Sequence, residues 1–242
     1  MIKKNIIILI LFWCFQIPAL SQIQFGPKAG LTITKPSFDQ FSGNTYKSGL
    51  QPGFQVGGMV FIPVTQQFGL QTELLFQRKG KSVYGQDLYE HKAYSNYLDL
   101  PILLNYTQGD RAFRWYLGAG GTISYWLGGG GKLTPVFGES VVKYDYDFGL
   151  NVPTANCYQI GLTLNAGTRF EIMDDRHIQL DFRFELGHTY MAEEREFMID
   201  DFADNMLYSN RVASVSVAYL FTYFKKKQRL KSHTYDAKKR GN

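Results

Sequence analysis

Apolar and polar residues alternate strictly along residues 178–186, IQLDFRFEL. Every even position is large and apolar, and the odd positions from 179 to 185 are polar, with charges at Asp181, Arg183 and Glu185. Period-2 alternation is typical of a β-strand with two different faces. In a soluble sheet the aromatic face would form the core. In a membrane barrel it would meet lipid, and the charges would point inward.

The same alternation recurs along the chain and predicts eight strands. They cover 24–33, 53–63, 67–78, 96–107, 113–127, 157–171, 176–190 and 211–224. The long connections are 34–52, 79–95, 128–156 and 191–210, and the short ones are 64–66, 108–112 and 172–175. Long and short connections therefore fall at opposite ends. This asymmetry is typical of up-and-down barrels of the bacterial outer membrane, whose short turns are periplasmic.

The volume of the two faces decides which one points inward. Over eight strands the apolar face holds roughly three dozen mostly large side chains, too many for a barrel interior that is just wide enough to be filled. The polar face is smaller and rich in glycine. The sequence therefore predicts an all-β fold over 22–224: an eight-stranded antiparallel up-and-down transmembrane β-barrel. Aromatic residues near strand ends, including Tyr97 and Trp115, are expected to form girdles at the membrane interfaces.

The first residues predict export to that membrane. Lys3 and Lys4 precede an apolar run over 6–15, and residues 19–21 have small side chains at both ends. This order is typical of a secretory signal peptide, here 1–21, cleaved before Gln22. The apolar run is too short for a transmembrane helix, which needs ~20 residues.

The formal net charge of +5 belongs to the ends of the chain. Segment 225–242 holds eight Lys or Arg and one Asp, whereas 22–224 holds 16 basic and 20 acidic residues. The barrel itself is therefore acidic, which argues against nucleic acid as a partner. We expect the basic tail 225–242 to be a disordered periplasmic segment, or alternatively a contact for a periplasmic or secretion-complex protein. After cleavage only Cys157 remains, so an internal disulfide is excluded.

Three segments resemble a known family. YLDLPILLNY (97–106), GLQTELLFQRKG (69–80) and WYLGAGGTISYWL (115–127) are similar to strands of the PorT-type outer-membrane β-barrels of the Bacteroidetes. The resemblance covers the mature barrel, 22–224. It implies an eight-stranded outer-membrane barrel, and the family takes its name from a member linked to secretion of surface proteins. The basic tail departs from the usual ending on an aromatic strand residue. Pro101 is expected to mark a bulge or a local irregularity in its strand.

Motifs for catalysis, metal or cofactor binding are not found. The four histidines lack metal-ligand spacing, and His188 is followed at the second position by Tyr190 rather than serine. The glycine run 128–131 is not followed by Lys-Ser/Thr, so we interpret it as a flexible loop rather than a phosphate-binding one. The sequence predicts a protein that is not an enzyme and carries no cofactor.

Charged residues on the polar faces form the first candidate site. We interpret them as a structural network that points into the lumen. Its members are Lys28, Glu73, Asp99, Arg169, Asp181, Arg183 and Glu185. At the turn 174–175, charge pairing favours the register whose paired numbers sum to 350, with Arg169 directly opposite Asp181. Arg183 is expected to bridge toward Asp181, Glu185 or Glu73.

A second candidate site is the acidic segment 191–205. Its carboxylates are Glu193, Glu194, Glu196, Asp200, Asp201 and Asp204. They lack the order of a calcium loop. We expect a solvated outer loop, with divalent-cation bridging to lipopolysaccharide phosphates as the alternative.

Two functional classes remain open. One is a structural or interaction barrel that contacts outer-membrane lipid and lipopolysaccharide and serves a secretion or envelope complex. The other is a porin-like channel for small solutes, against which the strand number and the inward charges argue. A lipid-modifying barrel enzyme is a remote third.

Overall fold

The computed structural model describes residues 22–38, 47–84, 89–110, 112–137, 140–141, 144–148, 156–190, 196–199, 202–205 and 208–224. Thirteen strands lie in these ranges: β1 (Gln22–Phe38), β2 (Lys47–Gly49), β3 (Gln51–Pro63), β4 (Phe68–Tyr84), β5 (Tyr89–Gly109), β6 (Phe113–Phe137), β7 (Ser140–Val141), β8 (Tyr144–Phe148), β9 (Tyr158–Met173), β10 (Arg176–Gly187), β11 (Glu196–Ile199), β12 (Phe202–Asn205) and β13 (Tyr208–Phe224). Over the same ranges, no helix is both long and apolar enough to cross a membrane. The signal peptide and the basic tail predicted at the two ends lie outside them.

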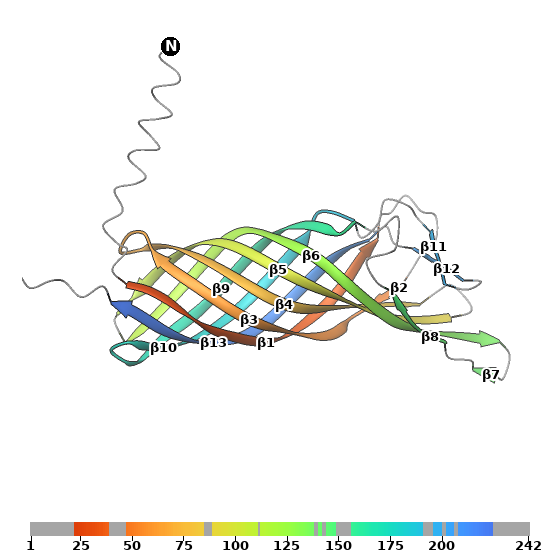
Figure 1. Cartoon of the computed structure of the whole chain (residues 1–242), viewed down its shortest axis with the longest axis horizontal. Helices are drawn as coiled ribbons and strands as arrows, with labels where there is room; N and C mark the ends of the chain where they lie inside the picture. Colours follow the sequence, from red (N-terminus) through yellow and green to blue (C-terminus); the bar gives the residue numbers. More distant parts are fainter. Residues whose placement is uncertain are drawn as a thin grey trace, which may run out of the picture.

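Eight of the described strands close into a barrel (Figure 1). The order around the wall is β1, β3, β4, β5, β6, β9, β10 and β13, each antiparallel to its neighbours, and β13 returns to pair with β1. The short strands β2, β7 and β8 pair with β4 and β6, while β11 and β12 form a separate hairpin. The predicted fold class is confirmed, and each predicted strand corresponds to one wall strand.

The register of the wall can be followed once around the barrel. Successive partners are Gln24, Phe61, Gln71, Leu103, Gly120, Thr163, Glu185, Val212 and Thr34. The path leaves β1 at Gln24 and returns to it at Thr34, a stagger of ten residues. Such a stagger makes the strands tilt, typically by about 35–45°, and leaves an interior that side chains can fill.

The two ends of the barrel differ. Tight turns at 64–67 and 174–175, and the short connection from β5 to β6, lie at the end that also holds the start of β1 and the end of β13 (Figure 1). At the other end the strands run further than predicted. Residues 79–84, 89–95 and 128–137, predicted as loop, belong to β4, β5 and β6.

The glycine run 128–131 is strand rather than the predicted flexible loop. It pairs with β5 on one side, and Gly129, Gly130 and Gly131 pair with β8 on the other. Glycine has no side chain to reveal a strand face, so the alternation disappears while backbone pairing continues. The register with β5 shifts just before Gly128, whose φ of +128° favours glycine.

The facing of the side chains follows the barrel prediction. On β10, Phe182 and Phe184 are 51% and 43% exposed, whereas Asp181 and Arg183 are 1% and 7% exposed. The aromatic face therefore points outward and the charged face inward. Tyr97 is a correction to the expected girdles: it is fully buried inside the barrel, because odd positions of β5 point inward.

Pro101 interrupts the pairing of β5 with β4, as expected for a residue without a backbone N–H. The paired positions of β4 skip from Thr72 to Leu75, opposite Ile102 and Asp99. The register does not shift across this gap. Pro101 therefore interrupts the backbone pairing between β4 and β5 without changing the alignment of the two strands.

Candidate functional site in the barrel lumen

Four charged side chains form a closed ring across the lumen. Lys28 comes from β1, Glu73 from β4, and Asp181 and Arg183 from β10. Lys28 Nζ lies 2.9 Å from Glu73 Oε1 and also pairs with Asp181. Arg183 Nη2 lies 2.7 Å from Glu73 Oε1 and 3.1 Å from Asp181 Oδ2. Each cation therefore contacts both carboxylates; we call this set the ion-pair ring.

The ion-pair ring is desolvated and electrically neutral. The exposed fractions of its side chains are 0% for Lys28 and Glu73, 1% for Asp181 and 5% for Arg183. Buried charges are tolerated where they are paired, because an unpaired charge loses its hydration without compensation. The ring ties together strands from different sides of the wall, so it occupies the lumen where a solute would have to pass.

A second cluster lies around Lys79 of β4. Lys79 Nζ is 2.6 Å from Glu185 Oε1 on β10 and 3.3 Å from Asp99 Oδ2 on β5. It also donates a hydrogen bond to Ser124 Oγ on β6 at 3.3 Å and lies 4.8 Å from the centre of the Tyr97 ring. The structure thus brings two of the predicted network residues, Asp99 and Glu185, to one lysine.

Lys79 itself was missed by the sequence interpretation. The predicted strand ended at 78, although the inward alternation Glu73, Leu75, Gln77 continues to Lys79. A signal was therefore present in the sequence. It was hidden because the outward positions beyond Phe76 are no longer apolar.

The predicted register at the turn 174–175 is wrong. The pairing of β9 with β10 places Arg169 opposite Gln179 and Asp181 opposite Gly167, so paired numbers sum to 348 rather than 350. A register irregularity at Arg176 accompanies the tight turn. The predicted bridge from Arg183 to Asp181 and Glu73 is present, whereas the predicted bridge from Arg169 to Asp181 is not.

Arg169 is satisfied by neutral groups. Its guanidinium donates to Gln179 Oε1 at 2.7 Å and to Gln24 Oε1 at 2.7 Å, and it lies 4.1 Å from the centre of the Phe61 ring. It forms no ion pair with any carboxylate in the described ranges. Arg169 and Asp181 do not pair, because amide oxygens and an aromatic face also stabilise a buried guanidinium, and because Lys28 reaches Asp181 from another strand.

Polar side chains link Arg169 to the ion-pair ring. Gln179 donates to the Tyr116 hydroxyl at 2.9 Å. Gln179 also donates to Gln71 at 3.4 Å, Asn105 donates to Gln71 at 2.7 Å, and Gln71 donates to Glu73. These neutral residues were not predicted, because glutamine and asparagine on a polar strand face carry no signal that separates a lumen network from a wet surface.

The acidic segment 191–205 stays largely untested. In the β11–β12 hairpin, Glu196 pairs with Asn205 and Asp204 pairs with Phe197. The side chains of Glu196 and Asp204 lie outside the described part of the structure. The other four carboxylates lie outside the described residues. Within the described residues, no group of three or more His, Cys, Asp or Glu side chains could hold a metal ion.

Comparison with known proteins places the chain in a family. Residues 16–189 match the family model described as outer membrane protein beta-barrel domain. No curated protein matches the chain significantly.

Solved outer-membrane proteins are similar to this chain. OprG from Pseudomonas aeruginosa is similar over 86% of this chain and 100% of its own, with 13% identity and a TM-score of 0.52. Neisserial surface protein A covers 81% of this chain and 96% of its own at 14% identity and a TM-score of 0.41. Ail of Yersinia pestis covers 83% and 98% at 11% identity and a TM-score of 0.39.

At these identities the likeness concerns the fold alone, and only the OprG comparison is close enough to support it. Together with the closed eight-stranded wall and the matched family model, it places the protein in the bacterial outer membrane. The chain belongs to the outer membrane protein beta-barrel domain family.

Proposed function

We propose that this protein is a closed outer-membrane barrel that acts through its surfaces, as an accessory to a secretion or envelope complex, and not as a diffusion channel or an enzyme. The ion-pair ring is the observation that carries the proposal. A pore needs a continuous hydrated path, whereas here Lys28, Glu73, Asp181 and Arg183 bind one another across the lumen.

Large buried side chains elsewhere inside the barrel support the same conclusion. Tyr97, Tyr116 and Trp126 are at most 1% exposed, and Met59 and Phe61 form a buried apolar cluster with Ala218 and Leu220 of β13. An eight-stranded barrel has an interior only wide enough for such filling. Moving the ring aside would therefore not open a path unless these side chains moved as well.

The secretion role rests on the resemblance of 69–80, 97–106 and 115–127 to PorT-type barrels. Its test is recovery of the tagged protein from cross-linked envelopes. We expect a defined envelope protein to co-purify with the full chain and to be lost when the basic tail 225–242 is removed. A control variant, Lys92→Gln, changes one exposed charge at the opposite end of the barrel and should keep the partner. Recovery of the barrel without any partner from both the full chain and Lys92→Gln would contradict the proposal.

The small-solute channel is the second candidate. The neutral polar side chains of the lumen, such as Gln55, Thr122 and Ser216, are the feature in its favour, because a polar lining can hold water. Conductance separates the two candidates, since a closed barrel gives no steady open level in a planar bilayer.

A further inference from the structure

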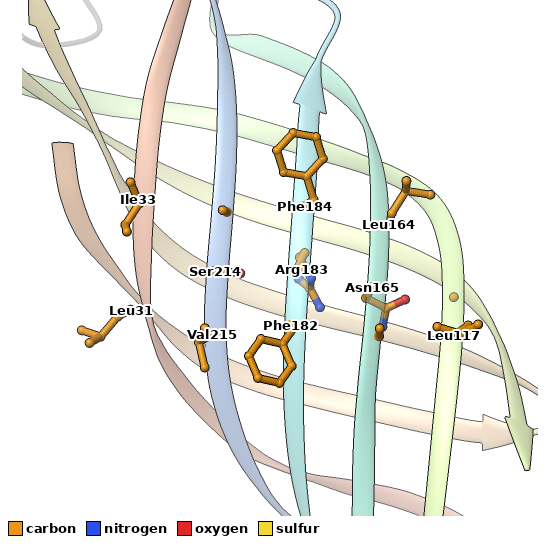
Figure 2. A pocket seen from close by; sticks show the side chains of 13 residues that line it. Leu31, Ile33, Leu117, Leu164, Asn165, Phe182, Arg183, Phe184, Ser214 and Val215 are labelled. Atoms are coloured by element: carbon orange, nitrogen blue, oxygen red, sulfur yellow. The ribbon is translucent and has the colours of Figure 1, made fainter. Parts of the chain in front are cut away.

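An apolar groove crosses the lipid-facing surface of β1, β13, β10, β9 and β6 (Figure 2). Its volume is about 800 Å³. Large side chains border it: Leu31, Ile33, Leu117, Leu164, Phe182 and Phe184. Two lining residues at outward positions, Ala213 and Ala166, are small where their neighbours are large. Ala213 pairs with Ile33 and Phe184, and Ala166 pairs with Phe182 and Leu117.

The groove leads to a pair of opposed cations. Lys35 is the next outward residue after Ile33 on β1, and Arg211 is the next outward residue beyond Ala213 on β13. The two are direct cross-strand partners, and both are exposed. Like charges directly opposite each other on a sheet repel and destabilise the pairing.

In the described part of the chain, no protein group neutralises this pair. Among the residues that the structure describes, Lys35 and Arg211 form no ion pair or side-chain hydrogen bond. Lys92, in contrast, is exposed at the same end of the barrel but has a carboxylate 2.6 Å away on Glu90. The Lys35–Arg211 pair therefore places two neighbouring positive charges at the edge of the apolar groove.

We propose that the groove and the Lys35–Arg211 pair form a binding site for a phosphorylated glycolipid of the outer leaflet. An acyl chain lies over Ala213 and Ala166, and the phosphate sits between the ammonium of Lys35 and the guanidinium of Arg211. The end with the long connections faces the cell exterior in such barrels, so the cations lie at the level of the outer-leaflet headgroups.

Charge complementarity selects this ligand. A guanidinium binds phosphate through two parallel hydrogen bonds, and an ammonium adds a point charge. A phosphate between the two cations turns their repulsion into attraction to a shared anion. Acyl chains alone would fill the groove without using the cations, and a soluble phosphate would use the cations without the groove.

The test is urea unfolding of the mature protein folded into phosphatidylcholine vesicles, with and without added bis-phosphorylated lipid A. We expect lipid A to stabilise the wild type and dephosphorylated lipid A or inorganic phosphate to have little effect. Arg211→Gln and Lys35→Gln should each respond more weakly to the same concentration of lipid A than the wild type does. In phosphatidylcholine alone they should be at least as stable as the wild type, because the repulsion is gone. Lys92→Gln should respond as the wild type does.

Two further measurements test the site: the affinity for lipid A and the effect of filling the groove. Titration with lipid A should give affinity about tenfold weaker for Arg211→Gln, the loss of one charge-assisted contact. Ala213→Phe, which fills the groove and leaves both cations, should also weaken binding. A wild-type response from Arg211→Gln, equal loss in Lys92→Gln, or equal stabilisation by phosphatidylglycerol would each overturn the site.

Discussion

The geometry of the ion-pair ring predicts a large loss of stability when one of its two cations is removed. Lys28→Met keeps the length of the side chain and deletes its charge. Glu73 and Asp181 are then left with Arg183 as their only cation in the ring. The lumen at this level changes from neutral to one net negative charge.

The size of the effect follows from the burial of the ring. Breaking a buried pair by removing one partner costs about 3–5 kcal/mol, because the remaining charge stays desolvated. Glu73 Oε2 and Asp181 Oδ1 have no protein hydrogen-bond partner in the described ranges, and both carboxylates keep Arg183. Because Arg183 still pairs with both carboxylates, the loss of Lys28 leaves neither of them without a cation, which reduces the penalty. We therefore expect the lower end of the range, about 3 kcal/mol of unfolding free energy.

A double-mutant cycle separates this charge effect from lost packing. Lys28→Met with Asp181→Asn restores neutrality and retains the Glu73–Arg183 pair. We expect a coupling energy of about 2 kcal/mol, measured by urea unfolding in vesicles. Lys92→Met is the matched control, because it breaks an exposed pair that contributes only about 0–1 kcal/mol. A cost for Lys28→Met no larger than that of Lys92→Met, or a cycle without coupling, would refute the reasoning.

Three other outcomes are expected. Surface protease on intact cells should cut between β6 and β9 or between β10 and β13 and spare 225–242; cleavage only in the tail would invert the topology. N-terminal sequencing of the envelope form should begin at Gln22, and an uncleaved leader would contradict the signal-peptide prediction. Gly120→Ala should cost about 1–3 kcal/mol, because its Cβ would lie 1.9 Å from the Ile102 carbonyl oxygen, while outward Gly121→Ala, with its nearest atom at 3.8 Å, should be nearly neutral in the same unfolding assay.

The strand pattern was readable where each strand crosses the lipid. There, most outward positions are large and apolar, as in Phe182 and Phe184, so the alternation is strong and the facing follows from volume. Above the lipid the outward residues become polar or glycine, as at Arg78 and Gly130. Backbone pairing between the strands continues there without the alternation of apolar and polar residues. The sequence prediction therefore missed the strand ends, and Lys79 with them.

The register and the contacts of the lumen were harder to predict, because they depend on several strands at once. A pairwise argument joined Arg169 to Asp181 on two adjacent strands. The structure instead satisfies Asp181 from β1 and Arg169 with amides. Which strand lies across the lumen from which depends on the tilt of the whole barrel, and no single turn encodes that stagger.

Single-molecule conductance of the purified protein in a planar bilayer tests the central claim most directly. The ion-pair ring and the buried aromatic residues predict no steady open level of porin size for the wild type, over both signs of applied voltage. Reproducible, uniform conductance steps from pure, fully folded protein would contradict the closed lumen and make the barrel a channel.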